Sequence, residues 1–121
     1  MRYLCLAYGD RKKVEALTKE DFEALVAKCR VYDEELKKSG HLVSSQSLEW
    51  DVMSLRPRGG KTVTMDGPFV ETKETVGGLI IIEARDLNEA LRVAALHPAA
   101  HLGEDLGWGI EVRPIADGCH Q

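Results

Sequence analysis

The residues best suited to chemistry gather in one short segment, 66–74, which reads Asp-Gly-Pro-Phe-Val-Glu-Thr-Lys-Glu. Asp66 and Glu71 are carboxylates of the kind that move protons, and Lys73 could hold negative charge that develops on an oxygen. We therefore predict these three as catalytic residues. The predicted ligand-binding residues come from the same segment and from two strands: Gly67, Pro68, Phe69, Thr72, Glu74, Gly78 and Tyr8.

The backbone around Asp66 is expected to be stiff. Gly67 precedes Pro68, which favours extended or positive-φ conformations that glycine adopts freely. If the chain then runs extended, Glu71 and Lys73 share one face, where they could hold an ion pair or a polar substrate. Gly77-Gly78, before an aliphatic run, would let a ligand or another backbone approach closely.

Each of these carboxylates also has an ordinary structural interpretation. Asp66 could cap its own turn, and Glu71, Lys73 and Glu74 could form a solvated, salt-bridged hairpin edge. Glu83 and Glu111 lie among apolar residues, where each carboxylate is either exposed at the rim or paired, and a structural ion pair is favoured over catalysis. The predicted partner for these two is Arg113.

Histidines and tryptophans outside this segment leave alternatives open. His97 and His101 are four apart and could hold a metal with Glu104 or Asp105, but Pro98 interrupts the helix between them. His97 would instead cap the short turn that Pro98 opens. Trp50 and Trp108 could each line a pocket or an interface.

We predict no metal and no cofactor. The sequence lacks a phosphate loop, a dinucleotide fingerprint, a serine nucleophile elbow and an HExxH helix.

Helices and strands that would position these residues follow from periodicity and caps. Strands are expected at 3–8, 41–48, 76–84 and 110–115, with a hairpin of 52–56 and 61–65 around a Pro-Arg-Gly-Gly turn. Thr18 caps a helix that ends at Ser39-Gly40. A second capping box, 86–89, opens a helix before Pro98. Its expected apolar stripe is Leu87, Leu91, Ala94 and Ala95.

The order is β-α-β, a hairpin insertion, then β-α-β, which predicts an α+β, ferredoxin-like sandwich. One helical layer leaves one face of the sheet bare. The aliphatic run 79–82 has no polar alternation to face water, so a second copy of the chain is expected to cover it. The predicted partner is therefore a homodimer through the sheet.

Composition bounds the remaining possibilities. The 121 residues make one domain, 1–121, and the 20 acidic against 16 basic residues argue against nucleic-acid binding. Three cysteines, Cys5, Cys29 and Cys119, without CxxC spacing favour a reducing compartment. The apolar runs are too short for a signal peptide or a membrane span. A cytoplasmic protein with no membrane partner is expected.

The segments 66–69 and 71–74, Gly77-Gly78, the opening 3–9 and the closing 111–114 together resemble the DGPF branch of the YCII-related proteins. The resemblance implies a ferredoxin-like fold of the dimeric α/β-barrel type, with a pocket near the sheet. Some broader relatives are dehydrochlorinases with a proposed His–Asp pair, the histidine on or near the first helix. The predicted first helix here contains no histidine, and His41 only follows it.

The combined expectation is a protein that binds a small polar or aromatic metabolite near residues 66–74. Cofactor-independent acid/base chemistry of an isomerase or lyase would act on that metabolite. The alternative is a non-catalytic regulatory or interaction module, because the resemblance also extends to proteins encoded beside sigma factors. The sequence does not decide whether the chain is an enzyme.

Overall fold

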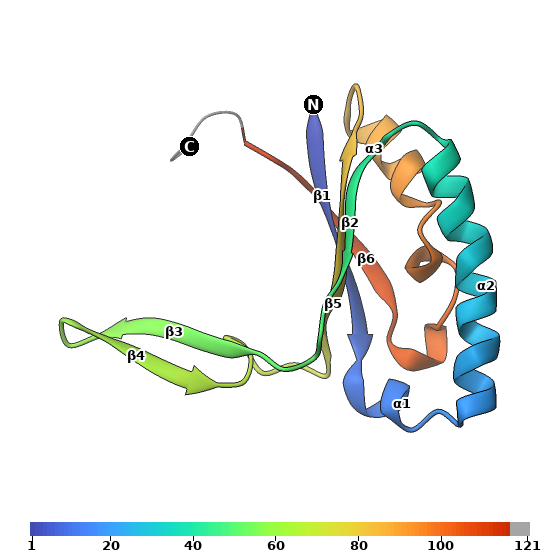
Figure 1. Ribbon diagram of the computed structural model, residues 1–121. Helices are drawn as coiled ribbons and strands as arrows, with labels where there is room; N and C mark the ends of the chain where they lie inside the picture. Colours follow the sequence, from blue (N-terminus) through green and yellow to red (C-terminus); the bar gives the residue numbers. More distant parts are fainter. Residues whose placement is uncertain (117–121) are drawn as a thin grey trace.

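Four strands form an antiparallel sheet in the computed structural model, which describes residues 1–116 (Figure 1). The strands are β1 (Arg2–Asp10), β2 (Leu42–Ser47), β5 (Glu74–Glu83) and β6 (Gly109–Pro114), in the order β2-β5-β1-β6. All four predicted strands are therefore present, and the aliphatic strand β5 is one of the two central ones.

Two helices, α2 (Lys19–Lys38) and α3 (Leu87–Ala94), lie on the same face of this sheet (Figure 1). Alternate residues of β1 and β5 turn to the helices, and their side chains form the core with Leu36 of α2: Tyr3, Cys5, Ile80 and Ile82. The arrangement is a ferredoxin-like α+β sandwich, as the element order predicts.

The intervening residues of β1 and β5 form the other face of the sheet, which we call the open face. Leu4 is in register with Ile81, and Leu6 with Leu79, and all four side chains are half-buried. They form an apolar band that no helix of residues 1–116 covers.

Side-chain caps start the helices where the sequence places them. The Thr18 hydroxyl accepts a hydrogen bond from the Asp21 N–H at 3.1 Å, and an Asp86 carboxylate oxygen accepts one from the Glu89 N–H at 2.9 Å. A five-residue helix that we did not predict, α1 (Arg11–Glu15), is capped in the same way by Asp10. These caps satisfy backbone donors that a helix N-terminus leaves unpaired.

The predicted apolar stripe of α3 was wrong except at Ala94, because Leu87, Leu91 and Ala95 are exposed. Leu87 and Leu91 are 48% and 49% exposed, whereas Ala90, Val93 and Ala94 are buried. Ala90, Val93 and Ala94 pack into the core with the side chains of β1 and β5, so the smaller side chains of α3 face the sheet. Small side chains let a helix approach the sheet closely.

A two-stranded hairpin projects from the other side of the sheet, away from the helices (Figure 1). Within the part of the chain that the structure describes, its strands β3 (Met53–Arg58) and β4 (Lys61–Asp66) pair only with each other, and we call residues 53–66 the arm. Gly59 and Gly60, at φ 56° and 79°, make the predicted tight turn. β3 runs through Pro57, which a strand tolerates at an edge.

Among residues 1–116, no helix has the length and apolar character to cross a membrane.

Candidate functional site

A pocket of about 400 Å³ lies between α2 and the sheet. Its volume falls in the range of small-molecule sites, about 300–1,000 Å³. Residues from the end of β1 and the adjoining α1, from α2, from β2 and the loop after it, from β5, and from the segment between α3 and β6 line it. Five segments distant in the sequence thus meet around one space.

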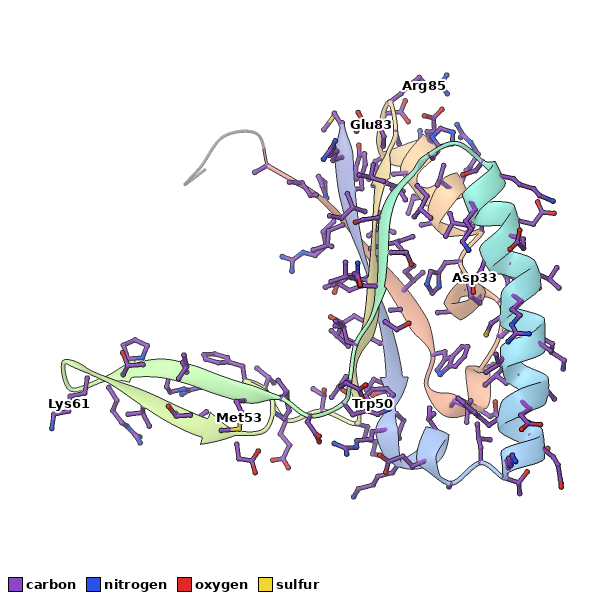
Figure 2. All side chains as sticks on the ribbon, in the orientation of Figure 1. Asp33, Trp50, Met53, Lys61, Glu83 and Arg85 are labelled. Atoms are coloured by element: carbon purple, nitrogen blue, oxygen red, sulfur yellow. The ribbon has the colours of Figure 1, made fainter. Side chains whose placement is uncertain are left out.

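Helix α2 contributes Cys29 and Asp33, which are four residues apart and share one face of the helix. Figure 2 shows Asp33 on the side of α2 that turns toward the sheet. Burial and the negative charge of Asp33 both raise the pKa of the Cys29 thiol. Cys29 is therefore a protonated thiol at neutral pH, and Asp33 is the anionic group of this wall.

His97 enters the same pocket from the loop after α3. The imidazole Nδ1 accepts a hydrogen bond from the Ala99 N–H at 3.0 Å and so caps the short helix η1 (Pro98–Ala100), as predicted from Pro98. A neutral ring whose Nδ1 accepts must carry its proton on Nε2. Burial lowers the pKa of His97, and the charge of Asp33 opposes that shift. The ring is held neutral, with Nε2–H as a donor.

Two indoles form another wall of the pocket. Trp50 and Trp108 lie against glycines of β1 and β5, at positions where a Cβ would meet their rings. A Cβ on Gly77 would lie 3.1 Å from Trp50, and one on Gly9 would lie 3.1 Å from Trp108. The predicted close approach of another backbone is confirmed at Gly78, where a Cβ would lie 3.2 Å from the carbonyl oxygen of Gln46, whereas the group that approaches Gly77 is the Trp50 side chain.

A second concavity lies between the arm and the body of the chain, and we call it the crook. It encloses about 1390 Å³. Seven of the predicted site residues line it: Asp66, Gly67, Pro68, Phe69, Glu71, Thr72 and Lys73. Gly67 has φ 98°, so the predicted stiff corner after Asp66 is present.

The remaining predicted site residues lie elsewhere. Tyr8 and Gly78 line the pocket, and Glu74 begins β5 opposite Asp10. Trp50 lines both the pocket and the crook, and Figure 2 shows it where the chain leaves the sheet toward the arm. The structure therefore divides the predicted site residues between two adjoining spaces.

Both predicted ion pairs with Arg113 were wrong for the described residues. Glu83 binds the amino terminus at 3.0 Å and Arg2 at 3.4 Å, and the first of these bonds is the main cause of its lowered pKa. A Glu111 carboxylate oxygen instead accepts a hydrogen bond from the Tyr8 hydroxyl at 2.8 Å, and this bond raises the pKa of Tyr8.

His101 does not share a helical face with His97. Its ring stacks on Tyr32 with centroids 4.9 Å apart, and its Nε2 contacts the carbonyl of Ala95. Cys5 is buried as expected, Cys29 lines the pocket, and Cys119 lies outside the described residues.

Sequence reasoning did not select Asp33 and His97 as site residues. They are far apart in the chain, and each had an adequate local explanation: Asp33 as one position of a helical repeat, His97 as a cap. The available signal was the spacing from Cys29 to Asp33, because a helix capped at Thr18 with Leu36 in its core also turns these two side chains inward.

Comparisons with known proteins agree with this architecture. Residues 1–116 match the YCII-related domain. The chain is 32% identical, over 118 residues, to an uncharacterised protein of Rhizobium meliloti (strain 1021), covering 96% of this chain and 93% of that protein.

A solved structure with a similar fold is the 5-chloro-2-hydroxyhydroquinone dehydrochlorinase TftG of Burkholderia phenoliruptrix AC1100, in complex with 2,5-dihydroxybenzoquinone. The TM-score is 0.51 with 16% identity, over 99% of this chain and 98% of that one.

Proposed function

The chain belongs to the YCII-related family, and from this premise we propose that it binds a small oxygenated metabolite in the pocket and moves a proton on it. The observation that carries the proposal is the pairing of a neutral Nε2–H donor on His97 with the carboxylate of Asp33 in one pocket. No described residue of 1–116 accepts a hydrogen bond from that Nε2–H.

A neutral imidazole fixed as a donor suits an oxygen that gains negative charge during a reaction. Because the Ala99 N–H occupies Nδ1, His97 cannot take a second proton without losing that hydrogen bond. It therefore acts as a hydrogen-bond donor to a carbonyl or phenolic oxygen.

Asp33 takes the role of the base in this proposal. Its carboxylate accepts a proton from a C–H or O–H bond of the ligand, and the electron pair of that bond moves toward the oxygen held by His97. The pair then takes a proton at another atom, which is an isomerisation, or expels a leaving group that carries the pair away, which is an elimination. Both outcomes balance without an oxidant or reductant.

Two further features support a flat ligand. Trp50 and Trp108 present aromatic surfaces to the pocket, and aromatic rings favour offset stacking with other rings. The fold resemblance to a dehydrochlorinase bound to 2,5-dihydroxybenzoquinone makes that quinone a suitable probe.

The test is the exchange of the ring C–H protons of 2,5-dihydroxybenzoquinone in D₂O, followed by NMR, with affinity measured by calorimetry. Asp33→Asn should leave binding measurable and slow the exchange at least about 100-fold, the lower limit for a general base. His97→Asn keeps an acceptor for the Ala99 N–H and loses the imidazole donor, so it should weaken binding and exchange together.

Lys73→Ala and Asp66→Asn are the matched variants in the crook. Unchanged exchange in both is expected if the pocket is the site. Exchange lost in these variants and kept in Asp33→Asn would place the chemistry in the segment 66–74, where Asp66, Glu71 and Lys73 remain the predicted catalytic residues. Failure of the wild-type protein to bind the quinone would contradict the ligand class.

We propose, in addition, that two copies pack through their open faces and that the quartet 66–69 places the chain in the DGPF branch. The half-buried band of Leu4, Leu6, Leu79 and Ile81 supports the dimer, because apolar sheet faces of this kind are ordinarily covered.

A non-catalytic interaction module is the second candidate function. The exposed apolar side chains of the arm favour it, since they are available to a partner protein. Binding of the quinone without any catalysed exchange, in every variant, would support this candidate over the enzyme.

A further inference from the structure

One face of the arm carries apolar side chains that nothing in residues 1–116 covers. Along β3, Met53 and Leu55 are 62% and 61% exposed, and Pro57, on the same face, is also exposed. Their partners across the hairpin are Asp66, Thr64 and Thr62. The face is thus an apolar stripe backed by small polar residues.

The opposite face of the arm is covered by the segment that follows it. The Ser54 hydroxyl donates to the carbonyl of Gly67 at 2.7 Å, and the Arg56 guanidinium lies 4.4 Å from the ring centroid of Phe69. Val63 and Met65 on that face are half-buried. The two faces of the arm therefore differ: the face with Met53, Leu55 and Pro57 is exposed, and the opposite face is covered.

A two-stranded hairpin is only marginally stable by itself in water. The arm pairs with no other strand, and it extends on the same side of the sheet as the apolar open face (Figures 1 and 2). The crook lies at the base of the arm, where Met53 lines it, and the open-face residues Leu4, Leu6, Leu79 and Ile81 do not. Its volume of about 1390 Å³ exceeds that of ordinary small-molecule sites.

Charge identifies a suitable partner for the arm. Residues 53–66 carry three basic side chains, Arg56, Arg58 and Lys61, and one acidic side chain, Asp66, a net charge of +2. Of the 16 basic and 20 acidic residues in the whole chain, 13 and 19 remain outside the arm, a net charge of −6. The arm is complementary in sign to the body of its own protein, and it can meet that charge on a second copy.

We infer that the β3–β4 arm clasps the body of a second copy, with Met53, Leu55 and Pro57 buried in the contact. By two-fold symmetry each body receives the arm of the other chain. Because Met53 also lines the crook, a contact that buries Met53 brings the partner next to the crook and to Asp66. The inference rests on the proposed dimer through the open face and adds a second contact to it.

The experiment compares the dimer dissociation constants of three variants by sedimentation velocity. The double variant Met53→Asp/Leu55→Asp should weaken the dimer by roughly 100-fold, as expected for two desolvated apolar anchors. Val31→Asp on α2 is the matched control, since Val31 is 64% exposed on the helical side and should leave the constant unchanged. Leu6→Asp tests the open face separately.

The outcomes separate the arm from the sheet and from the pocket. If Leu6→Asp dissociates the dimer while the arm variant associates like wild type, the clasp is overturned and the sheet dimer stands. A wild-type protein that is monomeric at micromolar concentration overturns both. Neither result affects the pocket proposal, because quinone binding is measured separately and its residues come from one chain.

Hydrogen exchange of the wild-type arm provides a second readout that needs no substitution. Amides of residues 53–66 should be protected in the dimer and lose protection when the protein is diluted below its dissociation constant. Equal exchange at every concentration would overturn the clasp even if the charged variants fail to fold.

Discussion

Protonation of His97 would remove a hydrogen bond as well as add a charge. The acceptor Nδ1 already holds the Ala99 N–H at 3.0 Å, and a protonated Nδ1 would face that N–H as a second donor. Burial also lowers the pKa of His97 and so favours the neutral ring. Local geometry and desolvation thus keep this ring neutral despite the nearby charge of Asp33.

His97 gives the protein a predictable loss of stability in weak acid. Its folded pKa lies below the value of about 6.5 expected when unfolded, so in that window the unfolded chain binds the extra proton. The stabilisation is complete above that value and is lost as pH falls through the folded pKa. Chemical unfolding of wild type and His97→Asn between pH 7 and 5 checks this. The variant should show the smaller loss, and parallel curves would contradict the assignment.

Gly77 is a sheet glycine at which a side chain would crowd the Trp50 ring. In Gly77→Ala the new Cβ would lie 3.1 Å from the Trp50 ring, so the indole must shift. We expect changed tryptophan fluorescence and weaker quinone binding. Gly109→Ala is the control, because a Cβ there meets no atom within 4 Å. Identical spectra for the two variants would contradict this expectation, because they would show that the Trp50 ring accommodates the new Cβ without shifting.

The helix caps are the features that the sequence predicts best. Thr18 and Asp86 follow local rules, and both caps are present with the expected partners. The cap at Asp10 obeys the same rule, yet α1 was missed because Gly9-Asp10 also ends a strand. Short-range chemistry therefore predicts where a helix starts, and ambiguity arises where one residue serves two elements.

The facing of a helix is harder to predict than its start. Leu87 and Leu91 looked like the buried stripe of α3, but Ala90, Val93 and Ala94 face the sheet. The candidate site is similar, since Asp33 and His97 meet only through the packing of α2 and the η1 loop. Such contacts depend on tertiary distances that residue spacing does not contain.

Loss of the Thr18 cap should destabilise the fold measurably. Thr18→Ala removes the acceptor of the Asp21 N–H, and we expect the free energy of unfolding to fall by about 1 kcal/mol. Thr18→Ser keeps the hydroxyl and should stay close to wild type. Denaturant titration of the three proteins measures the difference, and equal losses in both variants would show that the methyl group matters instead.

At the scale of the whole molecule, the opposite charges of arm and body predict a salt-dependent dimer. Raising the ionic strength should screen their attraction and increase the dissociation constant. Arg58→Glu/Lys61→Glu should flatten that dependence. Sedimentation at low and high salt tests both expectations. A dimer that tightens with salt in wild type would indicate an association driven by apolar contact alone.

The fold could be predicted at this scale because element order restricts the topologies of a four-stranded sheet. The direction of the arm could not be predicted, although its two strands and its turn were predicted. Within residues 1–116, the strands of this hairpin are not hydrogen-bonded to the strands of the main sheet. Local sequence patterns therefore predict the two strands but not their orientation relative to the sheet.

The arm also leaves and rejoins the sheet at neighbouring points. Ser47 and Gly78 are register partners, and the Leu48 N–H donates to the carbonyl of Gly77 at 3.0 Å. Residues between these points form an insertion in an otherwise ordinary strand connection. Within it, none of residues 53–66 lines the pocket, so mutation and changes of length can accumulate in the arm without disturbing the sheet or the pocket. Relatives could therefore diverge in their choice of partner while inheriting the same pocket.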